Sequence, residues 1–175
     1  MKTVRIDTSR IKEIVEQIEC GDEVLLSGTV YTARDAAHKK IMALIAEGST
    51  LPFDIDGASI YYAGPTPERE GAVCGSFGPT TSSRMDAYSP ALLDLGLACM
   101  IGKGPRNESV REAIVRNRAI YLCAIGGAGA LCSKSITSLE VIDFPELGCE
   151  SIKKLTFKDF PLICGIDARG NSLFD

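Results

Sequence analysis

The sequence has little of what metal sites and nucleophilic hydrolases usually need. Its seven cysteines include no C-x-x-C pair, the closest two are nine residues apart, and His38 is the only histidine. These spacings argue against a metal site made by this chain alone. The sequence also has no G-x-S-x-G elbow, no G-x-x-x-x-G-K-[ST] loop and no obvious Cys/His dyad. Conventional hydrolase and P-loop nucleotide chemistry are therefore disfavoured.

Long apolar runs and long basic runs are missing as well. No stretch reaches the ~18 apolar residues that a membrane span needs, and the first residues lack the apolar segment of a signal peptide. We therefore expect a cytoplasmic protein that does not act at a membrane. The formal net charge of −4, without a basic run, argues against nucleic acid as the partner. Most cysteines lie in apolar runs, which predicts buried, reduced thiols.

The chain has 175 residues, 45% of them hydrophobic and 24% charged, which is typical of one globular domain. Helical patterns and turn signals predict helices over residues 8–20, 33–47, 90–97 and 110–117 and a short one ending near 135. Strands are predicted over 23–31, 58–63, 72–77, 98–101, 119–125, 139–144, 151–157 and 162–166. Helices and strands alternate through the middle and strands cluster at the end. This order predicts one α/β domain, residues 1–175, with a mixed sheet.

Several residues have a predicted structural role. Thr32 and Ser109 each begin the spacing of a capping box, so both are predicted helix N-caps. Gly126–Gly129 follows a strand but does not have the G-x-G-x-x-G spacing, so close backbone packing is favoured over dinucleotide binding. For His38, a hydrogen-bonded histidine of the core or behind the site is favoured over a catalytic base.

The segment from Gly78 to Asp86 is the most informative part of the sequence. Gly78 and Pro79 form a turn, residues 80–83 are four consecutive hydroxyl side chains, and Arg84 adds a planar cation. Hydroxyl groups and backbone N–H groups at a helix start, together with an arginine, are suited to binding an anion. The alternative is an ordinary helix cap followed by a solvated arginine.

Two further cations lie in comparable places. Arg34 opens a predicted helix and Lys103 lies between two glycines, and both, like Arg84, follow predicted strands. In open α/β sheets, ligands bind outside the carboxyl ends of strands, so these loops can converge on one small site. Arginine binds a carboxylate through two parallel hydrogen bonds and lysine can serve a second carboxylate, so a small dicarboxylate would fit. Scattered surface cations beside glycines are the alternative.

Six ordered segments carry a resemblance to a known family. They are Thr32–His38, Tyr61–Pro65, Gly78–Asp86, Gly102–Gly104, Glu146–Glu150 and Asp159–Pro161. In this order they resemble the β subunit of class I fumarate hydratase over about residues 18–172. The same unit forms the C-terminal domain of single-chain enzymes of that family, and L-tartrate dehydratase has a similar β subunit.

The resemblance implies a hydro-lyase that reversibly hydrates fumarate to (S)-malate with a 4Fe–4S cluster held by a partner α subunit. It implies a swivelling β/β/α domain that docks over that subunit in a hetero-oligomer and is inactive alone. The family's substrate-binding positions fall on Arg34, Thr80, Arg84 and Lys103, and its proposed base on Thr81. The chain departs from many relatives at Gly104–Asn107, which bears on the contacts of that loop and on the choice of diacid.

Three other functions stay open from the sequence. The chain could be an L-tartrate dehydratase β subunit, because a single hydroxyl separates the two substrates. It could be a non-catalytic domain that binds a dicarboxylate, or an enzyme on its own whose thiols build a cluster. The cysteine spacing disfavours the last of these.

Overall fold

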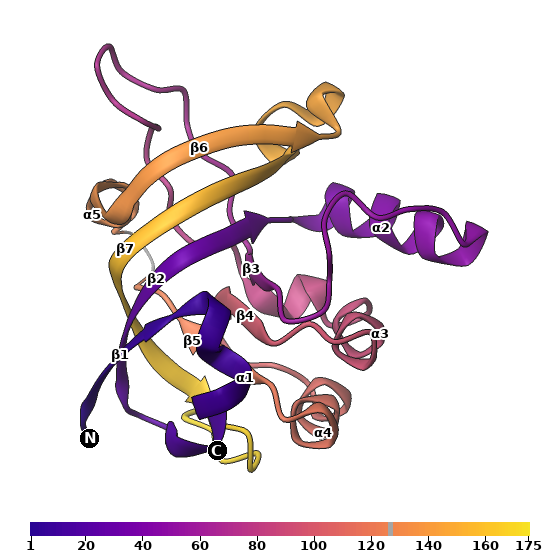
Figure 1. Cartoon of the computed structure of the whole chain (residues 1–175), viewed down its shortest axis with the longest axis vertical. Coiled ribbons are helices and arrows are strands. Elements are labelled where there is room, and N and C mark those ends of the chain that lie inside the picture. The colour runs from indigo at the N-terminus through magenta and orange to yellow at the C-terminus, as the bar shows by residue number, and fades with distance from the viewer. Residues whose placement is uncertain (126–127) are drawn as a thin grey trace.

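The fold is built on one mixed sheet of seven strands within the described part of the chain, residues 1–125 and 128–175 of a computed structural model (Figure 1). The strands are β1 (Thr3–Asp7), β2 (Glu23–Thr32), β3 (Ser59–Tyr61), β4 (Cys99–Gly102), β5 (Ile120–Cys123), β6 (Ile136–Asp143) and β7 (Ile152–Ile166). Their order is β1-β2-β3-β4-β5-β7-β6, and β7 also pairs with β2. Because β7 pairs with both β2 and β5, the sheet curves into a partly closed barrel.

Strand directions follow the predicted mixed pattern. Strands β1 to β5 pair in parallel, whereas β7 is antiparallel to β2, β5 and β6. The two strands predicted over 151–157 and 162–166 are one continuous strand, β7. Its first half pairs with β6 and its last residues pair with β5, while β2 accompanies it over most of its length.

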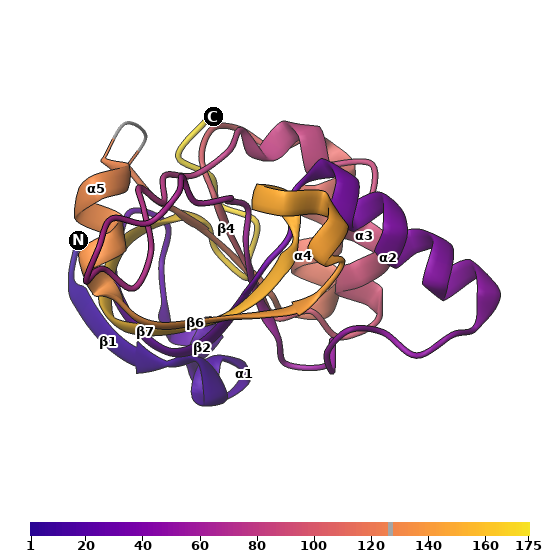
Figure 2. The same cartoon turned by 90° about the horizontal axis from the view of Figure 1, so that it is seen from above.

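The described part of the chain has five short α-helices, three of which lie together on one side of the sheet (Figure 2). They are α1 (Ile11–Ile14), α2 (Asp35–Glu47), α3 (Ser89–Asp94), α4 (Glu108–Asn117) and α5 (Gly129–Cys132). In Figure 2, α2, α3 and α4 gather on one side and β1, β2, β6 and β7 form a curved wall on the other. As predicted, Gly48 ends α2, with a left-handed φ of 67° that glycine adopts without strain.

The core has two parts, one on each side of the central strands. Inside the curved wall, Tyr61, Phe157 and Phe160 are buried together, and the Phe157 and Phe160 rings stack at 4.2 Å. The second part lies between the sheet and the helices and includes Ile60, Met100 and residues of α2, α3 and α4. Burial of these aromatic and aliphatic side chains is the main source of stability.

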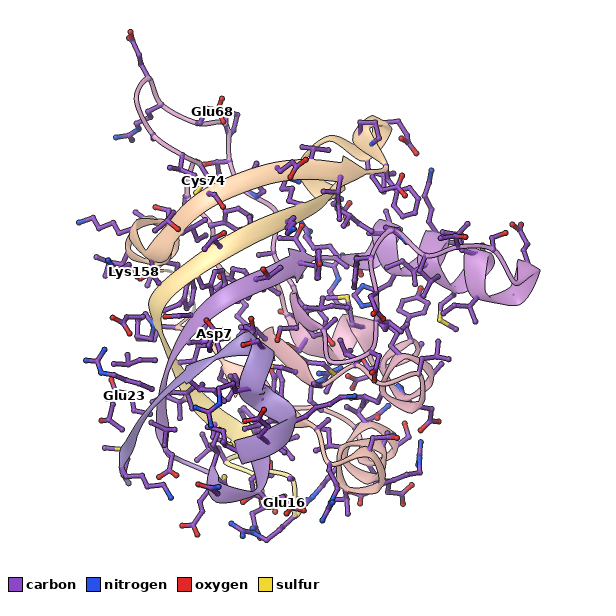
Figure 3. All side chains as sticks on the ribbon, viewed as in Figure 1. Asp7, Glu16, Glu23, Glu68, Cys74 and Lys158 are labelled. Atoms are coloured by element: carbon purple, nitrogen blue, oxygen red, sulfur yellow. The ribbon has the colours of Figure 1, made fainter. Side chains whose placement is uncertain are left out.

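Two predicted elements differ in the structure. The helix predicted over residues 8–20 is three short pieces, 3-10 turns at Thr8–Arg10 and Val15–Gln17 on either side of α1. The strand predicted over 72–77 is wrong, because these residues belong to a loop that the Thr66 and Ser76 backbones close. In Figure 3, Glu68 lies on this loop where it projects from the body and Cys74 lies nearer to β6.

Both predicted helix caps are wrong. Thr32 is the last residue of β2, and its buried hydroxyl accepts a hydrogen bond from Lys153 N at 3.0 Å. Arg34 holds the N-cap position of α2 instead. In α4 the cap is Asn107, whose side chain accepts from Val110 N at 3.0 Å, while the Ser109 hydroxyl binds the Asn107 side chain. Within the predicted glycine motif, residues 126 and 127 lie outside the described residues.

Candidate functional site

The carboxyl ends of three parallel strands bring two of the predicted cations to one edge of the sheet. Strands β2, β3 and β4 are parallel neighbours, so Thr32, Tyr61 and Gly102 end them at the same edge. Arg34 follows β2 by two residues and Lys103 follows β4 directly. The loops that carry these two cations therefore begin at the same edge of the sheet.

The hydroxyl-rich segment lies along this edge. Thr80 N donates to the carbonyl of Tyr62 at 2.6 Å, just beyond β3. Thr81 forms an isolated parallel bridge with Lys103, and Ser82 N donates to the Lys103 carbonyl at 3.0 Å. Thr80 and Thr81 therefore lie beside Lys103 as a short extension of the sheet. A 3-10 helix, η3 (Ser82–Met85), follows them, and Thr81 is its N-cap residue.

Arg84 connects this segment to the start of α2. Its Nε donates to Asp35 Oδ1 at 3.0 Å and its Nη2 lies 3.0 Å from Asp35 Oδ2. The guanidinium is half exposed, with 53% of the side chain accessible. Because arginine has five donors, the pair with Asp35 fixes the guanidinium and leaves donors for a second anion.

Arg34 lies next to this pair. Its side chain is 24% exposed, and its Nε lies 3.9 Å from Glu150 Oε1. A Cβ added to Gly64 would lie 3.4 Å from Arg34 Cδ, so the arginine stem packs against the chain just after β3. All five predicted residues thus belong to one edge of the molecule. Thr81 and Arg84 are exposed, and Arg34, Thr80 and Lys103 are partly buried, so this edge meets solvent.

A buried ion pair beneath the edge was missed by the sequence reasoning. Arg106 Nε donates to Asp86 Oδ1 at 2.6 Å, and the two side chains are only 0% and 8% exposed. Asn107 N donates to the other Asp86 oxygen at 2.9 Å, and Arg106 Nη2 donates to Ser89 Oγ at 2.7 Å. The pair joins the loop after Lys103 to the segment after Arg84. No pattern in the sequence marks either residue as buried.

His38 is a core histidine, as predicted. It is fully buried, its ring lies 5.5 Å from that of Tyr62 and 5.6 Å from that of Tyr88, and its Nδ1 lies 2.9 Å from the carbonyl of Arg34. A carbonyl only accepts, so Nδ1–H donates and Nε2 carries no proton. Burial is the main cause that lowers the pKa of His38 to about 4. The neutral imidazole therefore donates a hydrogen bond to the Arg34 carbonyl and holds the backbone of Arg34 in place.

The pKa of His38 predicts how stability depends on pH. In the unfolded chain the pKa of His38 is 6.5, so as the pH falls the unfolded chain takes up the proton at a higher pH than the folded chain does. The stability due to neutral His38 is therefore complete above pH 6.5 and is lost as the pH falls toward about 4, by about 3 kcal/mol. Because His38 is the only histidine, NMR of its ring gives one clean titration. We expect no titration between about pH 5.5 and 8, and an ordinary midpoint near 6.5 would contradict the buried position.

Comparison with known proteins identifies the family. The family described as "Fumarase C-terminus" matches residues 1–175. The chain belongs to this family. The resemblance noted over residues 18–172 is thus confirmed and extends to the whole sequence.

Three relatives show how this fumarase C-terminus chain compares with proteins of different lengths. It is 40% identical to "Fumarate hydratase class I, aerobic" of Escherichia coli over 99% of this chain and 33% of that protein. It is 37% identical to "Fumarate hydratase 2" of Leishmania major over 98% of this chain and 31% of that protein. It is 36% identical to "Putative L(+)-tartrate dehydratase subunit beta" of Methanocaldococcus jannaschii over 94% of this chain and 87% of that protein. The chain spans about a third of the two fumarate hydratases.

The thiols of this fumarase C-terminus chain do not fit an iron–sulfur cluster. Burial raises the pKa of Cys99 to about 12 and raises that of Cys132 as well, which disfavours the thiolate that a metal needs. Among residues 1–125 and 128–175, no three His, Cys, Asp or Glu side chains lie close enough together to hold a metal ion. In the same ranges, none of the helices has the length and apolar character to cross a membrane.

Proposed function

We propose that this chain is the β subunit of a cytoplasmic class I hydro-lyase that reversibly hydrates fumarate to (S)-malate. Its partner would be an α subunit that holds a 4Fe–4S cluster, and the two would form a hetero-oligomer. The observation that carries the proposal is the pairing of Thr81 with Lys103 beside Arg84, at one edge of a chain of the fumarase C-terminus family. The relative described as a subunit beta, of which this chain covers 87%, supports the role of a β subunit.

The chemistry of the edge suits a four-carbon dicarboxylate. Arg84 would bind one carboxylate through its planar guanidinium, and Lys103 and Arg34 would bind the other. Thr80 would donate a hydrogen bond from its hydroxyl. Asp35 already orients Arg84, so little ordering is needed when the substrate binds.

Thr81 is the proposed base that removes the C3 proton of malate. A threonine hydroxyl is a poor base unless nearby cations and N–H groups stabilise its alkoxide. The bridge between Thr81 and Lys103 pairs the backbones of the two residues, so the lysine that would supply such a cation is a neighbour of Thr81 in space. The cations that bind the carboxylates would also stabilise the negative charge that develops on the substrate as the proton leaves.

The open surface favours a site shared between two polypeptides. Substrate sites are normally concave, yet Thr81 and Arg84 are exposed at this edge while Arg34, Thr80 and Lys103 are partly buried beside them. We infer that residues 1–175 form one swivelling β/β/α domain and that the α subunit covers this edge. In the two fumarate hydratases, about two thirds of the protein lies outside the part that matches this chain, which supports this arrangement.

Anaerobic co-purification of the two chains tests the proposal. The complex is expected to hydrate fumarate, to lose activity in air as the cluster is destroyed, and to be inactive when either chain is omitted. Iron should copurify with the α subunit. Air-stable hydration by this chain alone would contradict the assignment.

The alternative substrate is L-tartrate, favoured by the 36% identity to the putative tartrate dehydratase β subunit. The ratio of kcat/KM for (S)-malate and L-tartrate decides between the two. If neither is turned over but the isolated chain binds malate with micromolar affinity, the chain is a dicarboxylate-binding domain.

A further inference from the structure

A buried serine lies directly beneath Thr81 and Lys103. Ser82 is fully buried, unlike its exposed neighbours Thr81 and Ser83. Lys103 N donates to Ser82 Oγ at 3.0 Å, and Ser82 N donates back to the Lys103 carbonyl at 3.0 Å. Two hydrogen bonds therefore join the two residues. One runs between their backbones, and the other runs from the Lys103 backbone to the Ser82 side chain.

Tyr121 on β5 completes this arrangement. Its hydroxyl lies 2.8 Å from Ser82 Oγ and 2.8 Å from the carbonyl of Gly104. A tyrosine hydroxyl has one proton and a carbonyl only accepts, so Tyr121 donates to Gly104 and accepts from Ser82. Hydrogen bonds thus run in one direction from Lys103 N through Ser82 and Tyr121 to Gly104. They hold the two ends of the Lys103–Gly104 backbone, the N–H of Lys103 and the carbonyl of Gly104.

The Ser82 side chain packs closely against the end of β4. A Cβ added to Gly102 would lie well inside contact distance of Ser82 Oγ and 2.9 Å from the Tyr62 ring. The Ser82 hydroxyl therefore packs directly against the Gly102 backbone. Only glycine at position 102 permits this approach.

The buried Asp86–Arg106 ion pair packs against the Tyr121 ring. The Arg106 guanidinium lies 5.0 Å from the centre of the Tyr121 ring and 5.3 Å from that of Tyr62, within the range of cation–π contacts. Asp86 fixes Arg106 by the 2.6 Å ion pair, and Asp86 lies four residues after Ser82 in the same turn. The ion pair, the tyrosine and the serine therefore form one buried network.

We propose that Ser82 is a positioning residue that, through Tyr121 and the Asp86–Arg106 pair, fixes Lys103 beside Thr81. Ser82 itself is too buried to reach a substrate. It acts by holding the backbone of Lys103, whose ammonium group would bind a carboxylate. The catalytic consequence rests on the proposed function, but the ordering of Lys103 does not.

Amide hydrogen exchange of the full chain tests the ordering. Ser82→Ala removes the acceptor of Lys103 N, so we expect exchange at Lys103 to accelerate at least ~10-fold, with the amides of β4 and β5 unchanged. Ser59→Ala is the matched control, because it removes an equally buried hydroxyl from β3. Unchanged exchange at Lys103 would overturn the proposal. An equal acceleration throughout β4 and β5 would do so too, because it would mean a general loss of stability.

Kinetics of the co-purified complex test the consequence. Ser82→Ala is expected to lower kcat/KM for fumarate by about 10- to 100-fold, as misplacement of a binding group does. Tyr121→Phe should also lower kcat/KM, by a smaller factor. This variant provides the test if Ser82→Ala does not fold. Normal kcat/KM in both variants would overturn the positioning role. If the wild-type complex does not hydrate fumarate while exchange at Lys103 behaves as expected, the proposed function fails and the ordering by Ser82 stands.

Discussion

Replacing Arg84 with alanine is expected to lower kcat/KM for fumarate by about 100- to 1000-fold in the complex with the α subunit. The guanidinium is the proposed ligand of one substrate carboxylate, and no other side chain of η3 can supply two parallel donors. The fold should be unaffected, because Arg84 is half exposed and its pair with Asp35 lies at the surface. Exposed ion pairs of this kind contribute less than about 1 kcal/mol to stability.

Arg116→Ala is the matched control for this prediction. Arg116 forms a comparable exposed ion pair with Asp94, at 2.9 Å, on the side of α4. Its loss should leave both folding and turnover unchanged. Normal turnover in Arg84→Ala, measured beside this control, would remove Arg84 from the site.

Replacing Arg106 with methionine is expected to lower the free energy of unfolding by about 3–5 kcal/mol. The substitution keeps most of the buried volume but leaves the Asp86 carboxylate, 8% exposed, without its cation. An uncompensated buried charge is among the most destabilising changes in a protein. Urea unfolding of the isolated chain, followed by circular dichroism, measures the effect.

Two comparisons separate the buried charge from other causes. Changing Asp86 to leucine in the Arg106→Met chain removes the unpaired charge and should recover part of the lost stability. Arg5→Ala breaks an exposed 2.8 Å pair with Asp159 and should cost less than about 1 kcal/mol. A loss in Arg106→Met as small as that in Arg5→Ala would contradict a structural role for the buried pair.

The parts of the fold and site that follow local rules could be predicted from the sequence. Apolar runs between turn signals located most of the central strands, and the end of α2 at Gly48 follows from the ease with which glycine adopts a left-handed conformation. The placement of the loops that carry Arg34 and Lys103 at one edge needed only the rule that parallel strands end at one edge.

Contacts between distant segments could not be predicted in the same way. Thr32 has the spacing of a helix cap, but a strand more than a hundred residues later uses its hydroxyl. Residues 72–77 have a β-rich composition, but they form a loop that pairs with none of the strands in the described part of the chain. Arg106 is a charged residue next to a proline, and only the tertiary structure reveals that Asp86 and two aromatic rings bury it.

The structure of the α–β complex with (S)-malate bound would test the central claim most directly. We predict that the malate carboxylates lie within hydrogen-bonding distance of Arg84 and Lys103, with Thr81 Oγ1 facing C3 and the α subunit covering this edge. Malate bound only by residues of the α subunit, or with the edge of β2, β3 and β4 facing solvent, would contradict the account.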